Sequence, residues 1–82
     1  MSGEEKETIL FVDDEENILR SLRRLFHREG YHILLAKSGR KGLELLQEHP
    51  VDLVVSDVRM PEMNGVEFLN RVRKMHPEVA CM

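Results

Sequence analysis

The chain has 82 residues, enough for one small domain with a single hydrophobic core. Twelve basic and fifteen acidic residues leave a net charge of −3, which gives no reason to expect direct binding to nucleic acid. The longest apolar runs are four residues, too short to span a membrane. Cys81 is the single cysteine and cannot form an internal disulfide, so we expect a cytoplasmic protein.

Three short apolar segments predict β-strands. They cover residues 8–12, 31–36 and 51–56, and a fourth apolar run begins at Val79. Their apolar residues are continuous rather than alternating, which is typical of strands that are buried on both faces of a parallel sheet. Residues 1–7 are mostly polar, and we expect them to be a flexible N-terminus.

Helical periodicity fills the intervals between these strands. The first helix is predicted over residues 15–29 and ends at Gly30, the second covers 39–48 after a Ser38 N-cap, and the third follows an Asn64–Glu67 capping-box spacing. One apolar stripe on the first helix should be buried: Ile18, Leu19, Leu22, Leu25 and Phe26. The second helix should bury Leu43, Leu45 and Leu46. The third helix should bury Val66, Phe68, Leu69, Val72 and Met75.

Basic residues recur on another face of the first helix, at Arg20, Arg24 and Arg28, with Arg23 and His27 beside them. A solvated charged face is the simpler interpretation of this pattern. A docking face for an acidic partner is the alternative.

Strands that alternate with helices predict an α/β fold with a parallel sheet and helices on both faces. The first and third strands end in acidic residues, Asp13-Asp14 and Asp57. Parallel strands end at one edge of the sheet, where open α/β folds bind their ligands, so these carboxylates should converge if the two strands are neighbours. Three such carboxylates repel one another unless a cation neutralises them, and an oxygen-only ligand set suits Mg²⁺ or Mn²⁺.

Two motifs together resemble the receiver domain of bacterial two-component response regulators. They are Phe-Val-Asp-Asp-Glu-Glu-Asn at residues 11–17 and Ser-Asp-Val-Arg-Met-Pro-Glu-Met-Asn-Gly at residues 56–65. The resemblance implies a flavodoxin-like sheet in the order 2-1-3-4-5. The resemblance extends from residue 8 to the last residue of this sequence, and it covers only the first two-thirds of a receiver domain.

The resemblance also implies roles for the matching residues. Asp57 would accept a phosphoryl group from a histidine kinase or phosphotransfer protein, and Asp13 and Asp14 would hold Mg²⁺ together with Asp57. The backbone carbonyl of Arg59 would be a further metal ligand. Pro61 and Gly65 would shape the loop after the acceptor. Such a chain is a phosphoacceptor rather than an enzyme, with Mg²⁺-dependent self-phosphorylation as its only reaction.

Receivers also carry a Thr or Ser after the fourth strand and a Lys after the fifth, beyond the matching part of this sequence. We therefore expect residues 8–82 to be an incomplete receiver that binds metal but phosphorylates poorly. The third strand would then be a sheet edge. Two copies could associate through it, or by swapping segments, into a homodimer.

Two other functions stay open from the sequence. One is a receiver-like interaction or dimerisation module that is never phosphorylated. The other is a phosphohydrolase with an aspartate nucleophile, which is disfavoured because Arg59 stands where such enzymes carry a second acid.

Overall fold

The computed structural model of the protein describes residues 7–57 and 64–81. Strands and helices alternate along the chain, as the sequence predicts. The elements are β1 (Thr8–Val12), α1 (Glu16–His27), β2 (His32–Ala36), α2 (Gly39–Glu48), β3 (Leu53–Ser56), α3 (Gly65–Met75) and β4 (Ala80–Cys81). The bounds of α2 are those expected, whereas α1 is shorter at both ends and β3 begins two residues later than predicted. The prediction of a flexible N-terminus falls almost wholly on residues outside the described ranges.

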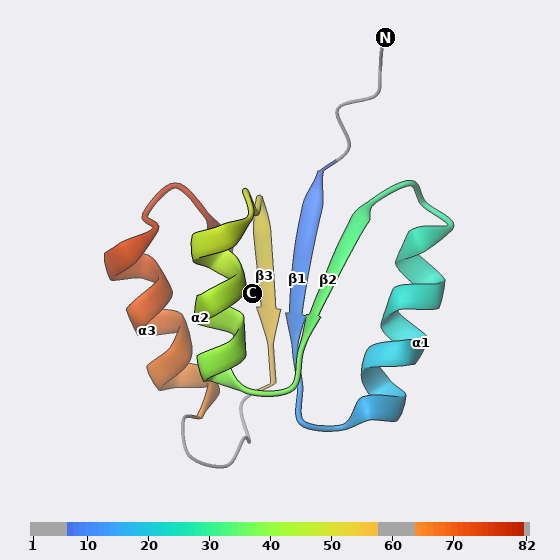
Figure 1. Ribbon diagram of the computed structural model, residues 1–82, viewed down its shortest axis with the longest axis horizontal. Coiled ribbons are helices and arrows are strands. Elements are labelled where there is room, and N and C mark those ends of the chain that lie inside the picture. Colours follow the sequence, from blue (N-terminus) through green and yellow to red (C-terminus); the bar gives the residue numbers. More distant parts are fainter. Residues whose placement is uncertain (1–6, 58–63, 82) are drawn as a thin grey trace, which may run out of the picture.

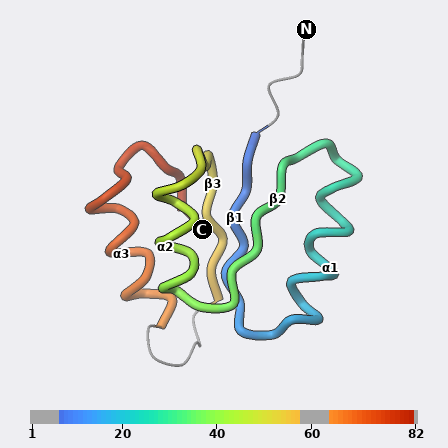
Figure 2. Tube along the Cα trace, in the orientation of Figure 1, coloured from blue at the N-terminus to red at the C-terminus, as the bar shows by residue number. Residues whose placement is uncertain are grey.

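The four strands form one parallel sheet in the order β2-β1-β3-β4. This order is the beginning of the predicted flavodoxin-like order, and Figures 1 and 2 show β1 between β2 and β3. The prediction that the third strand is a free sheet edge is wrong over part of its length. Leu53 and Val54 pair with Ala80 and Cys81, because α3 returns the chain to that edge of the sheet.

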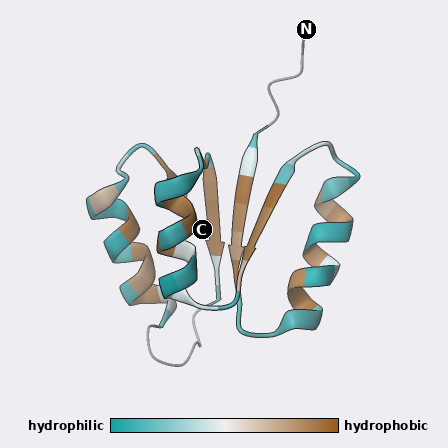
Figure 3. Cartoon of the chain, viewed as in Figure 1, coloured by the Kyte–Doolittle hydropathy of each residue, from teal (hydrophilic) through white to brown (hydrophobic). Residues whose placement is uncertain are grey.

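Helices cover both faces of the sheet: α1 lies on one face, and α2 and α3 lie on the other (Figure 1). Alternate strand residues point to opposite faces. Leu10, Val12 and Val54 therefore join the core beneath α2 and α3, while Ile9 and Phe11 join the core beneath α1. In Figure 3 the strands are coloured mainly as hydrophobic, while each helix carries both hydrophobic and hydrophilic residues.

The buried stripes on α1 and α3 are narrower than predicted. On α1, Leu19 is buried, while Ile18 and Leu25 are 45% and 58% exposed. On α3, Phe68 and Val72 are buried, while Val66 and Met75 are largely exposed. A single sheet face contacts only part of each helix, so residues displaced to one side of the stripe remain in solvent. Leu43, Leu45 and Leu46 of α2 all pack in the core as expected.

The predicted N-caps are confirmed, with one difference. The Ser38 Oγ accepts a hydrogen bond from the Lys41 N–H at 3.1 Å, and the Asn64 Oδ1 accepts from the Glu67 N–H at 2.9 Å. The Glu67 carboxylate accepts from Arg71, one turn further along α3, instead of completing the reciprocal half of a capping box. Gly30, after α1, has a φ of +88°, a conformation that favours glycine.

Gly42 is the point of closest approach between α2 and the core. A Cβ atom here would lie 2.9 Å from Phe68 Cζ and 3.1 Å from Val12 Cγ2, and both of these side chains are buried. We expect Gly42→Ala to lower the free energy of unfolding by about 1–2 kcal/mol, because overpacking outweighs the gain in helix propensity. Urea denaturation followed by circular dichroism measures this change.

The matched control for this substitution is Gln47→Ala, an exposed position on the same helix. It should change the free energy of unfolding by less than about 0.5 kcal/mol. A Gly42→Ala variant that is as stable as the unchanged chain would contradict the close contact.

Candidate functional site

Neighbouring strands position the candidate acidic residues. Asp13 directly follows β1, and its backbone N–H donates to the Ala36 carbonyl at 3.0 Å. Asp57 directly follows β3, and its N–H donates to the Val12 carbonyl at 2.9 Å. The hydrogen-bond ladder of the sheet therefore extends through both aspartates, and the positions of their backbones are set by the sheet rather than by a loose loop.

The turn between β1 and α1 uses part of Asp13. Its Oδ1 accepts a hydrogen bond from the Glu15 N–H at 2.9 Å, while the Glu15 side chain makes no capping hydrogen bond. This is the local turn that aspartate favours before a helix. This hydrogen bond uses only one of the two carboxylate oxygens of Asp13, and it was not predicted from the sequence. The Asp-x-Glu spacing before a helix was the signal for it.

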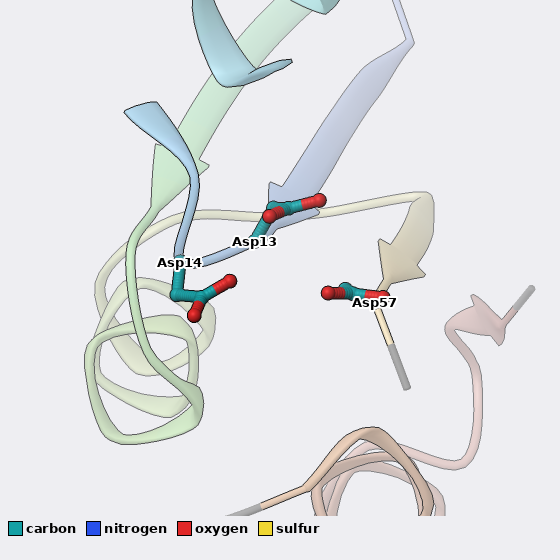
Figure 4. Close-up of side chains that lie close together, drawn as sticks. All are labelled: Asp13, Asp14 and Asp57. Carbon is teal, nitrogen blue, oxygen red and sulfur yellow. The ribbon is translucent and has the colours of Figure 1, made fainter. Parts of the chain in front are cut away.

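The three carboxylates come together as predicted. Asp13, Asp14 and Asp57 each contribute an oxygen atom to a group in which these atoms lie within 4.8 Å of one another. In Figure 4 the carboxylates of Asp14 and Asp57 point toward one another, and Asp13 lies beside the space between them. Asp14 is exposed, while Asp13 and Asp57 are half-buried, so solvent can reach the cluster from one side.

The chemistry of this group fits a small hard cation. All three donors are carboxylate oxygens, the ligand type that Mg²⁺ prefers. Oxygen ligands about 2.1 Å from an octahedral Mg²⁺ lie roughly 3–4 Å apart, close to the spacing of the cluster. Waters would complete the coordination on the exposed side, because Mg²⁺ usually retains several of them.

Glu16 is close in sequence to the acidic cluster but forms its own ion pairs. Its carboxylate accepts from Lys37 Nζ at 3.3 Å and from Arg20 Nη2 at 2.8 Å. Lys37 and then Arg20 lower the pKa of Glu16 below its usual value. Glu16 is therefore engaged by cations at the start of α1. Its pairing with Lys37 could not be predicted from the sequence, because it depends on the packing of α1 beside β2.

The remaining predicted site residues are only partly described. Arg59 and Pro61 lie outside the described residues. Gly65 is buried and is the first residue of α3, directly after the Asn64 cap. Within the described residues, Ser56 makes a further contact beside the carboxylate cluster, since its Oγ donates to the Asp57 carbonyl at 3.0 Å.

Comparison with known proteins agrees with this fold. A model of the response regulator receiver domain matches residues 9–82. The chain belongs to this family. The chain is 41% identical over 69 residues to the transcriptional regulatory protein GlrR of Escherichia coli (strain K12). The matched region covers 84% of this chain and 16% of that relative.

Two solved receiver structures are also similar to this receiver domain. The response regulator TrrA of Thermotoga maritima, in complex with Mg²⁺-BeF, has a TM-score of 0.87 and 35% identity over 92% of this chain and 65% of that one. The beryllofluoride-activated receiver domain dimer of NtrC4 has a TM-score of 0.85 and 35% identity, over 92% of this chain and 62% of that one. The chain thus spans only part of the length of each relative.

The family assignment confirms the resemblance seen in the sequence, and the observed sheet confirms the predicted fold class. A receiver domain is a regulatory module of two-component systems. In the part of the chain that the structure describes, no helix is both long and apolar enough to cross a membrane.

Proposed function

We propose that this receiver domain accepts a phosphoryl group on Asp57, with Mg²⁺ held by Asp13, Asp14 and Asp57. The observation that carries the proposal is the convergence of these carboxylates within 4.8 Å at one edge of the sheet. A cluster of like charges is costly in the absence of a cation, so the arrangement is better explained by binding than by stability. The Mg²⁺-BeF complex of the similar TrrA supports the choice of cation, and Mn²⁺ would use the same oxygen ligands.

The proposed reaction is a direct transfer. One Oδ atom of Asp57 attacks the phosphorus atom of the donor, a P–O bond forms, and the bond from phosphorus to the donor breaks. With a phosphohistidine donor the leaving imidazole takes up a proton, and with acetyl phosphate the leaving group is acetate. Bound Mg²⁺ supplies charge neutralisation for the anionic phosphoryl group. The sheet holds Asp57 in place, and Asp13 and Asp14 retain the cation beside it.

The partners that we propose follow from the family. The phosphoryl donor is a histidine kinase or a phosphotransfer protein. The NtrC4 receiver dimer supports assembly of this receiver into a homodimer as well, although pairing with β4 leaves less of the third strand open for this than we expected. Light scattering that finds only a monodisperse monomer would reject the homodimer. We propose no direct binding of this chain to nucleic acid or to a membrane. Its cytoplasmic location stays a prediction.

The proposed function is tested by incubating the chain with acetyl phosphate and measuring its intact mass. The expected result is a single added phosphoryl group that requires Mg²⁺ and disappears when EDTA removes the metal. A chain that never gains a phosphoryl group but retains its fold would contradict the proposal. That outcome would favour the alternative of an interaction module that is not phosphorylated.

Metal binding can be measured separately. Replacement of Asp14 by Asn removes one negative charge from the cluster, and we expect Mg²⁺ affinity to fall by at least about tenfold. Titration of Mg²⁺ into the ¹⁵N-labelled chain, followed by amide chemical shifts, gives this affinity.

Asp52→Asn is the matched control for the metal titration. Asp52 lies at the opposite end of β3, where its carboxylate accepts from the Thr8 N–H at 2.8 Å, and an Asn oxygen can preserve that hydrogen bond. The control loses the same charge but should bind Mg²⁺ like the unchanged chain. Equal loss of affinity in both variants would show that net charge, and not the cluster, determines binding.

A further inference from the structure

One flank of α1 carries a groove whose lining, among the described residues, is basic. Arg20, Arg23, Arg24 and His27 line it, and we call it the arginine groove. These residues stand at positions i, i+3, i+4 and i+7, so they share one face of the helix. The groove is open to solvent and has a volume of about 420 Å³.

A second hollow adjoins the arginine groove on the side of β2. Arg20 and Arg23 line both, and the second hollow adds Glu16, Lys37, the half-buried Leu35 and the buried Leu19. The combined surface therefore offers cations along α1 and partly exposed apolar surface of Leu35 on β2. A binding partner would therefore have higher affinity if it carried acidic side chains with an apolar side chain among them.

The charge of this surface is opposite in sign to that of the chain. Four cations, Arg20, Arg23, Arg24 and Lys37, face a single carboxylate, Glu16, which gives +3 with His27 neutral, whereas the whole chain carries −3. Glu16 pairs with Arg20 and Lys37. Among residues 7–57 and 64–81, no carboxylate forms an ion pair with Arg23 or Arg24.

We propose that the arginine groove and its adjoining hollow form a docking surface for an acidic segment of a partner protein. Arg20 and Arg24 are one helical turn apart, about 6 Å between their Cβ atoms. Alternate side chains of an extended peptide are about 6.6 Å apart, so an extended segment with acidic residues at every second position matches this spacing. A short segment can contact the basic surface without contacting the acidic remainder of the chain.

Nucleic acid and anionic lipid fit the surface less well. A long polyanion bound to the groove would also lie close to the rest of the chain. That remainder carries a net charge of −6, because the whole chain carries −3 and the basic surface carries +3. Asp13 and Asp14 of the acidic cluster lie just before α1, at the same end of the helix as Glu16. Like-charge repulsion there disfavours an extended phosphate backbone or a membrane surface.

The probe for this proposal is a short fluorescein-labelled peptide of alternating Glu and Leu residues, whose binding is measured by fluorescence anisotropy at about 0.1 M salt, where the Debye length is about 10 Å. The decisive variant is Arg23→Glu with Arg24→Glu. Its matched control is Arg73→Glu with Lys74→Glu, which changes the net charge equally at exposed positions on α3. Circular dichroism verifies that both variants are folded.

We expect the α1 variant to bind the peptide at least about tenfold more weakly, and the α3 variant to lose less than about threefold, since exposed charges act over only about a Debye length of 10 Å. Amide shifts on peptide addition should cluster on α1 and around Lys37. The proposal is overturned by equal weakening in both variants or by absence of binding at about 0.1 M salt. Tighter binding of a single-stranded oligonucleotide or of anionic vesicles would also overturn it.

The docking surface is independent of the phosphoacceptor, since none of its residues belongs to the carboxylate cluster. Asp57→Asn should therefore bind the peptide as the unchanged chain does. This comparison separates failure of the docking proposal from failure of the proposed function.

Discussion

Replacing Asp57 by Asn is expected to abolish phosphoryl transfer to the chain from acetyl phosphate. An amide lacks the negative charge and nucleophilic oxygen that a carboxylate provides. The other two acidic residues remain, so Asp57→Asn should still bind Mg²⁺, more weakly. The assay therefore uses Mg²⁺ at a concentration that saturates the variant, and intact mass measures the phosphorylated fraction after a fixed time.

Asp52→Asn serves as the control for this experiment too, because it removes the same charge from the other end of β3. It should gain a phosphoryl group as fast as the unchanged chain. If Asp57→Asn is phosphorylated to the same extent as the control, the nucleophile is another residue and the assignment of Asp57 is wrong.

The largest effect on stability is expected for Phe68→Ala. Phe68 is completely buried between α3, Gly42 of α2 and Val12 of β1, so its ring joins both helices on that face to the sheet. Loss of a buried phenyl ring costs about 3–5 kcal/mol, the sum of lost burial and of the cavity left behind. Domains are commonly stable by only about 5–15 kcal/mol, so this variant should lose a large part of its stability.

Urea denaturation with circular dichroism again gives the free energy of unfolding. Val66→Ala is the matched control, since Val66 lies on the same helix and is 59% exposed. It should change the free energy of unfolding by less than about 0.5 kcal/mol. Comparable losses from the two substitutions would contradict the orientation of α3 in the structure.

Most of the architecture could be predicted from local patterns in the sequence. The continuous apolar runs that end at Val12 and Ala36 identified parallel strands, and Ser38 and Asn64 marked two helix starts through their side-chain oxygens. The convergence of Asp13, Asp14 and Asp57 followed from one geometric rule, that parallel strands end at a common edge. These features depend on short-range chemistry and on topology.

The features that could not be predicted depend on how much surface each element contacts. Periodicity placed Ile18 and Leu25 in the buried stripe of α1, but the packed structure leaves them 45% and 58% exposed. The ion pair between Glu16 and Lys37 joins residues 21 positions apart, and its formation depends on the packing of α1 beside β2. The pairing of β4 with β3 likewise depends on the path of the chain after α3.

The most direct test of the account is to locate the phosphoryl group chemically. Borohydride reduces an aspartyl phosphate to homoserine, and tandem mass spectrometry of the digested chain identifies the residue that was converted. After incubation with acetyl phosphate and Mg²⁺, the account predicts homoserine at position 57, and none when Mg²⁺ is omitted. Homoserine at another position, or a phosphorylated chain without any homoserine, would contradict it.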